Sequence, residues 1–593
     1  GNSEDAPGGY NQLVGIGSGT CSTSALDTLT QNAVPQSINV IAPTTLRVVK
    51  AWGANSSSGD SAIVGATTGG SNNTSGFTVA GGTAGNSGTP VIISVGNTIT
   101  FPAETGTNIG NYNTTLSCTA DGGATANLLS GTNGQVANTL LIGAGDLSKA
   151  IVCTYTNTRK SASLTLRKVW VSARNGETAT VTSSGFGNNA SSGLSTSTGN
   201  NTTTGTSVTV YAGESGTISE VLSNAANYTA TLACTGNGTA LSGNTLTINP
   251  ADTAITCTQT NTRRSATLTL VKTWSNARVG ETATVTSSGF GNNASSGLST
   301  STGNNTTTGT SVTVYAGETG TISEVLSNAA NYTASLACTG ATDSNPADGL
   351  TIDPADTAIT CTQTNTRKSA TLTLVKTWAN ARNGETATVS TSGFGNNAST
   401  GLSTSTGNNS TTGTSVTVYA GESGTISEVL SNAANYTATL ACTGNGTALS
   451  GNSLTIDPAD TAITCTQTNT RKSATLTLVK TWVNAVISDS VTVSATGLTS
   501  LSSTANAANE TDTGAAQTVY AGEVITLAEN FTSGSAGNYN RVLTCSGNTQ
   551  SLAGNALTVD PADTTVTCTW TNTFMPQVYL TVTKISQGRT GSF

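Results

Sequence analysis

A unit of 104 residues recurs almost unchanged along the chain, and this periodicity constrains the fold more than any other feature. Four segments of the form Leu-Thr-Leu-x-Lys-x-Trp are spaced by 104 residues and end at Trp170, Trp274, Trp378 and Trp482. A related segment, LRVVKAW, ends at Trp52, 118 residues before Trp170. Tandem copies of this length fold as successive units that contact mainly their neighbours. We therefore predict five complete domains, at 44–160, 161–264, 265–368, 369–472 and 473–575.

Within each unit, apolar and polar residues alternate with a period of two. In the segment LTLVKTW that ends at Trp274, the two leucines, Lys272 and the tryptophan share one face of an extended strand. The same alternation recurs in ATVTS, SVTVYAG, TISEV, YTATLAC and AITCTQTN, which Gly- and Asn-rich turns separate. About seven short strands per hundred residues predict an all-β chain of Ig-like β-sandwich domains. Because the joins between domains are very short, we expect an elongated array.

The absence of histidine and the scarcity of charge argue against several classes of function. Without His, the Ser/His/Asp and Cys/His catalytic groups and His-ligated metals are excluded. A net charge of −8 with only 22 Lys and Arg argues against nucleic-acid binding, and no apolar run reaches 18 residues, which argues against membrane insertion. We expect no metal, no cofactor and no activity on an external substrate. The chain begins without Met or a signal peptide, so we expect a processed or cropped form.

Ten of the 11 cysteines fall in pairs, one pair per predicted domain. Both members of each pair lie on the inward parity of their strands, and four of the pairs are spaced by 23 residues and the first by 35. In a chain without His, such pairs indicate disulfides formed in an oxidising compartment, since a zinc site would lack its third and fourth ligands. The predicted disulfides are Cys118–Cys153, Cys234–Cys257, Cys338–Cys361, Cys442–Cys465 and Cys545–Cys568. Cys21 is left over.

Each domain also places a lysine, a glutamate and an asparagine on inward-facing positions. A lysine in a sandwich core must be neutral or paired, because an unpaired buried ammonium is too costly. The lysines, in the first strands, are Lys50, Lys168, Lys272, Lys376 and Lys480. The glutamates are Glu104, Glu220, Glu324, Glu428 and Glu529, and only Glu104 lacks apolar neighbours of the same parity. The asparagines, near the ends of the last strands, are Asn157, Asn261, Asn365, Asn469 and Asn572.

This combination resembles the Cna B-type or SpaA-like domains, which are prealbumin-like sandwiches of bacterial surface adhesins and pili. The resemblance covers essentially the whole chain. It implies that a neutral Lys272 amine attacks the Asn365 carboxamide while Glu324 moves protons, which forms an isopeptide bond and releases ammonia, and likewise in the other domains. Burial favours the neutral amine and the protonated carboxyl that this reaction needs. The alternative is a buried Lys–Glu ion pair that Asn hydrogen-bonds, with the disulfide as the covalent link.

The two ends of the chain resemble halves of one further domain. In 576–593, Leu580, Val582 and Lys584 match the start of a first strand, whereas 1–43 resembles the back half of a domain, with Glu4 and Asn39 in the glutamate and asparagine places. Either the chain is a window of a longer repeat protein, or the Lys584 strand of one copy completes the N-terminal half-domain of the next. The second arrangement predicts an intermolecular Lys584–Asn39 bond. The two halves are short of a full domain, and Pro35 stands where the mate of a cysteine would be.

These features predict an extracellular structural protein, the repeat stalk or filament subunit of a bacterial surface adhesin or pilus. Disulfides, and isopeptide bonds if they form, would protect each domain against pulling and proteolysis. The alternative is an adhesive module whose diverged first and fifth domains bind a glycan or a host or matrix protein.

Overall fold

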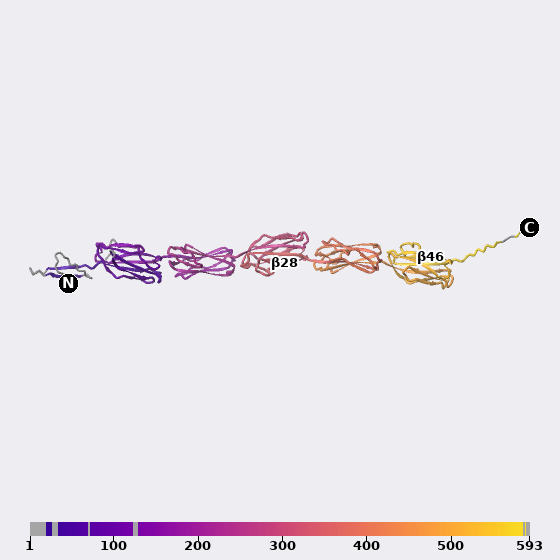
Figure 1. Ribbon diagram of the computed structural model, residues 1–593, viewed down its shortest axis with the longest axis horizontal. Helices are drawn as coiled ribbons and strands as arrows, with labels where there is room; N and C mark the ends of the chain where they lie inside the picture. The colour runs from indigo at the N-terminus through magenta and orange to yellow at the C-terminus, as the bar shows by residue number, and fades with distance from the viewer. Residues whose placement is uncertain (1–18, 26–33, 69–70, 122–127, 585–587, 589–593) are drawn as a thin grey trace.

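A computed structural model describes residues 19–25, 34–68, 71–121, 128–584 and 588. Five two-sheet β-sandwiches follow one another along a single axis, and residues 19–25 and 576–584 lie at opposite ends of the array (Figure 1). The prediction of an elongated all-β tandem array is thereby confirmed. We number the sandwiches from first to fifth in chain order.

The third sandwich illustrates the topology, because its sequence is typical of the repeat. Its strands are β22 (Ser265–Ser275), β23 (Thr282–Ser288), β24 (Ser295–Thr300), β25 (Thr306–Thr308), β26 (Val312–Tyr315), β27 (Thr319–Leu326), β28 (Tyr332–Thr339), β29 (Leu350–Thr351) and β30 (Ala358–Arg367), with the 3-10 turn η4 (Ala329–Asn331) before β28. One sheet has the order β25-β22-β30-β28, with β26 also paired to β22, and the other has the order β24-β23-β27-β29.

The core lies between these two sheets and follows from the alternation in the sequence. Leu268 and Leu270 of β22, Val285 of β23 and Ile359 of β30 are fully or almost fully buried, whereas the threonines between them face outward. The first strand β22 and the last strand β30 are parallel neighbours, with Trp274 opposite Asn365. The turn before β28 depends on Asn328, whose φ of 49° lies in the left-handed region that Asn tolerates better than most residues.

The other sandwiches repeat this arrangement. The first contains β3 (Thr45–Trp52), β4 (Ser61–Thr68), β5 (Ser71–Ala80), β6 (Gly85–Ser87), β7 (Val91–Ile92), β8 (Thr98–Phe101), η1 (Ile109–Asn111), β9 (Tyr112–Ala120), β10 (Thr132–Asn133), β11 (Asn138–Leu141), η2 (Ala144–Asp146) and β12 (Ala150–Arg159). The second contains β13 (Ser161–Val171), β14 (Thr178–Ser184), β15 (Ser191–Thr196), β16 (Asn201–Thr204), β17 (Val208–Tyr211), β18 (Ser215–Leu222), η3 (Ala225–Asn227), β19 (Tyr228–Thr235), β20 (Thr245–Thr247) and β21 (Ala254–Arg263).

The fourth contains β31 (Ser369–Ala379), β32 (Thr386–Ser392), β33 (Ser403–Thr404), β34 (Asn409–Thr412), β35 (Val416–Tyr419), β36 (Ser423–Leu430), η5 (Ala433–Asn435), β37 (Tyr436–Thr443), β38 (Ser453–Thr455) and β39 (Ala462–Arg471). The fifth contains β40 (Ser473–Val483), β41 (Ser490–Ala495), β42 (Leu501–Thr504), β43 (Glu510–Thr513), β44 (Gln517–Tyr520), β45 (Val524–Ser533), η6 (Ala536–Asn538), β46 (Tyr539–Ser546), β47 (Ala556–Thr558) and β48 (Thr565–Phe574).

Consecutive sandwiches are joined by a single residue outside the strands. The last strand β30 ends at Arg367 and the first strand of the next sandwich, β31, begins at Ser369, so that only Lys368 lies between them. The same spacing separates β12 from β13, β21 from β22 and β39 from β40. A connection this short keeps the strand directions of successive sandwiches close to one line, as Figure 1 shows.

The described terminal segments do not form complete sandwiches. Strands β1 (Gly19–Ala25) and β2 (Val34–Val40) form a two-stranded antiparallel sheet in which Ser24 is opposite Pro35. Residues 576–584, which the sequence predicts to begin a further domain, have no strand assignment, and Leu580 and Val582 are 87% and 81% exposed. Glu4 lies outside the described residues, as do the side chains of Cys21 and Asn39.

Candidate functional site

A lysine buried in the first strand is a feature that all five sandwiches share. Lys272 lies on β22 between Leu270 and Trp274, and its side chain is completely buried because its parity is that of the core. Its Nζ lies 4.1 Å from the centre of the Trp274 ring and donates a hydrogen bond to the Thr273 carbonyl oxygen, at 2.6 Å. The four equivalent side chains are also completely buried: Lys50, Lys168, Lys376 and Lys480.

A glutamate from the opposite sheet pairs with each lysine. In the third sandwich, Glu324 of β27 places Oε1 3.6 Å from Lys272 Nζ, so the ion pair joins the two sheets across the core. Glu104 forms the equivalent ion pair with Lys50 in the first sandwich, although it follows β8 and lies outside any strand. Its side chain is completely buried. The other Nζ–Oε1 distances are 3.2 Å for Lys50–Glu104, 3.5 Å for Lys168–Glu220, 3.6 Å for Lys376–Glu428 and 3.3 Å for Lys480–Glu529.

The asparagine completes the cluster from the strand beside the lysine. Asn365 of β30 is fully buried, and its Nδ2 donates a hydrogen bond to Glu324 Oε1 at 2.9 Å. Its Oδ1 has no hydrogen-bond partner among the described residues. Asn261 and Asn469 repeat both features, at 2.9 Å from their glutamates. A buried carbonyl oxygen without a donor is rare in folded proteins and calls for an explanation.

Burial makes the lysines easier to deprotonate. Withdrawal from water lowers the pKa of Lys50, Lys168, Lys376 and Lys480 to about 8, although the neighbouring glutamates oppose the change. The pKa of Lys272 is lowered for the same reason. A lysine with this pKa is neutral, and therefore nucleophilic, in a sizeable fraction of molecules near pH 8.

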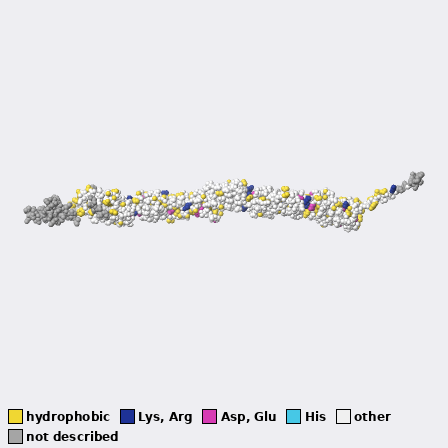
Figure 2. Space-filling view, in the orientation of Figure 1, with side chains coloured by type: hydrophobic (Ala, Val, Ile, Leu, Met, Phe, Trp, Pro, Cys, Tyr) yellow, Lys and Arg dark blue, Asp and Glu magenta, His cyan; other side chains and the backbone are white. Residues whose placement is uncertain are grey.

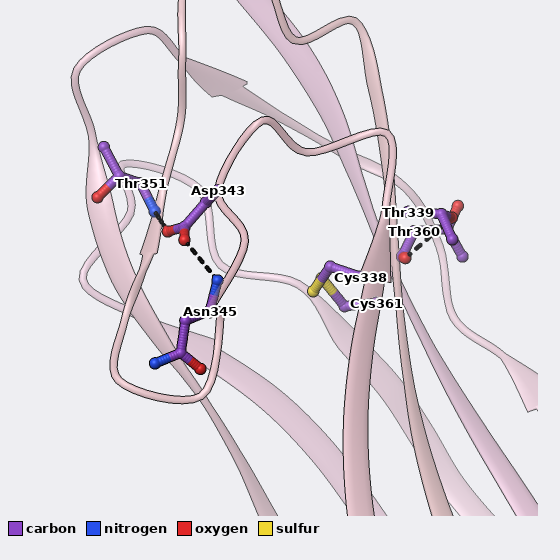
Figure 3. Close-up of a disulfide and its surroundings, with 7 residues drawn as sticks. All are labelled: Cys338, Thr339, Asp343, Asn345, Thr351, Thr360 and Cys361. Atoms are coloured by element: carbon purple, nitrogen blue, oxygen red, sulfur yellow. Dashed lines mark hydrogen bonds between the residues drawn. A yellow bond between two sulfur atoms is a disulfide. The ribbon is translucent and has the colours of Figure 1, made fainter.

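Each sandwich also contains a disulfide between its last strand and the strand beside it. Cys338 of β28 and Cys361 of β30 are opposite each other and bonded, next to the loop in which Asp343 accepts hydrogen bonds from the backbone of Asn345 and Thr351 (Figure 3). The other disulfides are Cys118–Cys153, Cys234–Cys257, Cys442–Cys465 and Cys545–Cys568.

The described residues contain no group of three or more acidic or cysteine side chains placed to hold a metal ion. Nor does any helix among them have the length and apolar character needed to span a bilayer. Lys584, the remaining predicted site residue, is exposed and lies in the extended segment that follows the fifth sandwich.

Sequence reasoning missed an arginine at every junction between sandwiches. Arg367, at the end of β30, donates from Nε to the Ala420 carbonyl oxygen of the fourth sandwich at 2.8 Å. Its Nη1 lies 3.8 Å from Glu422 Oε1, and its guanidinium lies over the Tyr419 ring at 5.8 Å. Arg159, Arg263 and Arg471 make the equivalent contacts. The sequence does contain a signal for this contact. The segments Thr-Asn-Thr-Arg and Tyr-Ala-Gly-Glu recur in a chain with only 9% charged residues.

Comparisons with known proteins give the following matches. Two SpaA-type sequence profiles, both described as prealbumin-like fold domains, match residues 19–159 and residues 263–363, 367–467 and 471–570. No curated protein matches the sequence.

Several solved structures are similar to the chain at low sequence identity. They include the Bacillus anthracis TIE protein (12% identity, 70% of this chain and 69% of that one, TM-score 0.30). The open form of the pilus adhesin SpaC from Lactobacillus rhamnosus GG has 13% identity over 73% of this chain and 57% of its own, with a TM-score of 0.24. Two B repeat units of the Staphylococcus aureus collagen binding protein have 13% identity over 70% of this chain and 100% of their own, with a TM-score of 0.16.

Proposed function

Because the chain belongs to the family of SpaA-type prealbumin-like fold domains, we propose that it is a structural protein of the bacterial cell surface, the stalk or filament section of an adhesin or pilus. The observation that carries this proposal is the position of the buried cluster. In each sandwich, Lys and Asn lie on the first and last strands, through which tension along the array enters and leaves. A covalent link between these strands would therefore carry the tension past the rest of the domain. We take 44–160, 161–264, 265–368, 369–472 and 473–575 as the domain boundaries.

The finer part of the proposal is an isopeptide bond between lysine and asparagine. In the third sandwich, Glu324 accepts a proton from the Lys272 ammonium, and the neutral Nζ attacks Asn365 Cγ. A new bond forms between Nζ and Cγ, and Glu324 passes its proton to Nδ2. Nζ then gives a second proton to Glu324 as the bond from Cγ to Nδ2 breaks and Nδ2 leaves as ammonia. No oxidant or cofactor is needed, and the fixed geometry replaces a bimolecular encounter. In the product, a protonated Glu324 would supply the donor that the buried Asn365 oxygen lacks.

The intact mass of the full chain, denatured and reduced, tests this bond. Each isopeptide bond removes one ammonia, about 17 Da, so a deficit in multiples of this value is expected. The variant Asn365→Ala should reduce the deficit by one ammonia, because its third sandwich lacks the electrophile. A chain with its full calculated mass would overturn the bond and leave the ion pair and the disulfide.

The C-terminal segment 576–584 could join copies of the chain into a filament. Residues 576–584 repeat the first-strand pattern, are exposed, and lie at the opposite end of the array from β2 (Figure 1). We propose that this segment of one copy pairs with β2 of the next, where a Lys584–Asn39 bond would make the polymer covalent; the alternative is a longer repeat protein. Sedimentation of the chain, and of Leu580→Asp, distinguishes them: oligomers that the variant loses favour pairing between copies, and monomers favour the longer array.

A second candidate function is binding by the fifth sandwich. A cleft of about 650 Å³ there is lined by residues that include Arg541, Asn555 and Trp570. The third sandwich has Ala334 and Gln363 at the places of Arg541 and Trp570, and most of the visible surface of the array is uncharged (Figure 2). Binding of the full chain to an array of glycans and matrix proteins, with Arg541→Ala as the comparison, tests this candidate. A ligand captured by the chain and lost in the variant would support it, and equal capture by both would contradict it.

A further inference from the structure

The five Lys–Glu–Asn clusters are not equivalent, because the glutamate contacts the asparagine in only three of them. In the second, third and fourth sandwiches, Asn Nδ2 donates to the glutamate at 2.9 Å. In the first and fifth sandwiches, neither side-chain atom of Asn157 or Asn572 has a hydrogen-bond partner among the described residues. The lysine pairs with its glutamate in all five sandwiches, and the difference lies in the contact between the glutamate and the asparagine.

The difference coincides with the residue opposite the asparagine on the neighbouring strand. Ala334 of β28 is opposite Asn365, and Ala230 and Ala438 hold the same place in the second and fourth sandwiches. In the first sandwich, Thr114 is opposite Asn157, and in the fifth, Arg541 is opposite Asn572. Side chains at directly opposed positions lie within contact distance of each other.

Thr114 and Arg541 each contact the glutamate carboxylate from the position that alanine holds in the other three sandwiches. The Thr114 hydroxyl donates to Glu104 Oε2 at 2.6 Å, and Arg541 Nη1 lies 3.9 Å from Glu529 Oε2. Both glutamate side chains are then completely buried, whereas those of Glu220, Glu324 and Glu428 are 9–10% exposed. The added group contacts Oε2 of the carboxylate. Oε1, which accepts from the asparagine in the other three sandwiches, has no hydrogen-bond partner among the described residues in Glu104 or Glu529. A guanidinium also favours the ionised carboxylate over the acid.

We propose that the side chain opposite the asparagine is a positioning residue that decides which sandwiches cross-link: the second, third and fourth form the isopeptide bond, and the first and fifth remain ion pairs. This inference rests on the proposed isopeptide chemistry. Proton transfer from lysine to leaving group needs one carboxyl in contact with both reacting groups. Only an alanine at the opposed position leaves the carboxyl able to make both contacts.

Peptide mapping of the full chain by mass spectrometry tests the proposal domain by domain. In the unmodified protein, the Lys168–Asn261, Lys272–Asn365 and Lys376–Asn469 cross-linked peptides are expected, each about 17 Da lighter than its two parts. Peptides that contain Lys50, Asn157, Lys480 and Asn572 should be linear. Ala334→Thr, which copies the first sandwich, should abolish the cross-link of the third sandwich alone.

Two further variants guard against a general effect on folding. Ala337→Thr places the same side chain on the outward face of β28, opposite Thr362, and should leave the third cross-link intact. Arg541→Ala gives the fifth sandwich the residue of the other three and should create a Lys480–Asn572 cross-link. This gain cannot result from misfolding.

The outcomes separate this inference from the proposed function. Cross-links in all five sandwiches, an intact third cross-link in Ala334→Thr, or no new cross-link in Arg541→Ala would each overturn the selection while the isopeptide chemistry stands. The absence of every cross-link would overturn the isopeptide chemistry itself, and the selection with it.

Discussion

A lysine ammonium in the core of a β-sandwich loses its hydration, and the buried carboxylate beside it compensates for only part of that loss. This balance explains why every lysine of the cluster has a lowered pKa although each pairs with a glutamate within 3.6 Å. Such a pair stabilises the fold less than its geometry suggests, and an amide bond, which carries no charge, removes the penalty. This cost supports the proposed isopeptide chemistry in the second, third and fourth sandwiches, where an amide bond would replace the ion pair.

The fifth sandwich, whose cluster is expected to remain an ion pair, predicts a distinctive pH dependence. Burial lowers the pKa of Lys480 to about 8, below its unfolded value of 10.5. Between these values the unfolded state binds the extra proton, so the free energy of unfolding should rise with pH from about 8 to 10.5, by up to a few kcal/mol. Below pH 8 the contribution should be constant. Thermal unfolding of the full chain and of Lys480→Met at pH 7 and 9.5 measures it; equal shifts in both proteins would contradict the assignment.

At the scale of elements, the junction arginines tie the last strand of one sandwich to a turn that connects the two sheets of the next, such as the turn between β35 and β36. Arg263, Arg367 and Arg471 are mostly buried, and each combines a backbone hydrogen bond, an ion pair and a stacked tyrosine. With a single residue between the strands, this leaves little freedom to bend. The last strand of the fifth sandwich ends instead at Phe574, whose ring packs edge-to-face against Tyr539 of the same sandwich.

Removal of the junction arginines should make the array flexible without unfolding it. In the triple variant Arg263→Ala, Arg367→Ala and Arg471→Ala, each junction loses about 1–3 kcal/mol of charged hydrogen bonding. We expect the maximum dimension from small-angle X-ray scattering to fall. The matched control replaces the exposed Arg174, Arg278 and Arg382 with alanine, which makes the same change in net charge. An unchanged dimension in the junction variant would show that the arginines do not stiffen the array.

The sequence alone was sufficient to predict which side chains face the core, because this depends only on strand parity. The inward positions of Lys272, Glu324 and Asn365 follow from alternation, since a period of two assigns each residue to a face. Glu104 fits the pattern poorly because it lies beyond the end of β8, where alternation no longer applies. The role of Arg367 depends on a contact 53 residues away in the next sandwich. The difference between Ala334 and Thr114 requires the register of neighbouring strands, which a single sequence does not reveal.

At the scale of the whole molecule, tension along the array acts on parallel first and last strands. Force enters the third sandwich at the start of β22 and leaves at the end of β30, so it shears all the hydrogen bonds between these strands together. A Lys272–Asn365 bond would hold the strands even after those hydrogen bonds break. The sandwiches with such a bond would then form an inextensible section, with extensible sandwiches at both ends.

Single-molecule stretching of the oxidised full chain tests the central claim most directly. A sandwich without the isopeptide bond releases roughly 280 Å of extended chain when it unfolds, because about 80 of its residues lie outside the disulfide loop. That loop spans 35 residues in the first sandwich and 23 in the fifth. Two unfolding steps of about this size are expected, from the first and fifth sandwiches, and none from the three between them. Five such steps would contradict the claim that the buried lysine and asparagine lock these domains covalently.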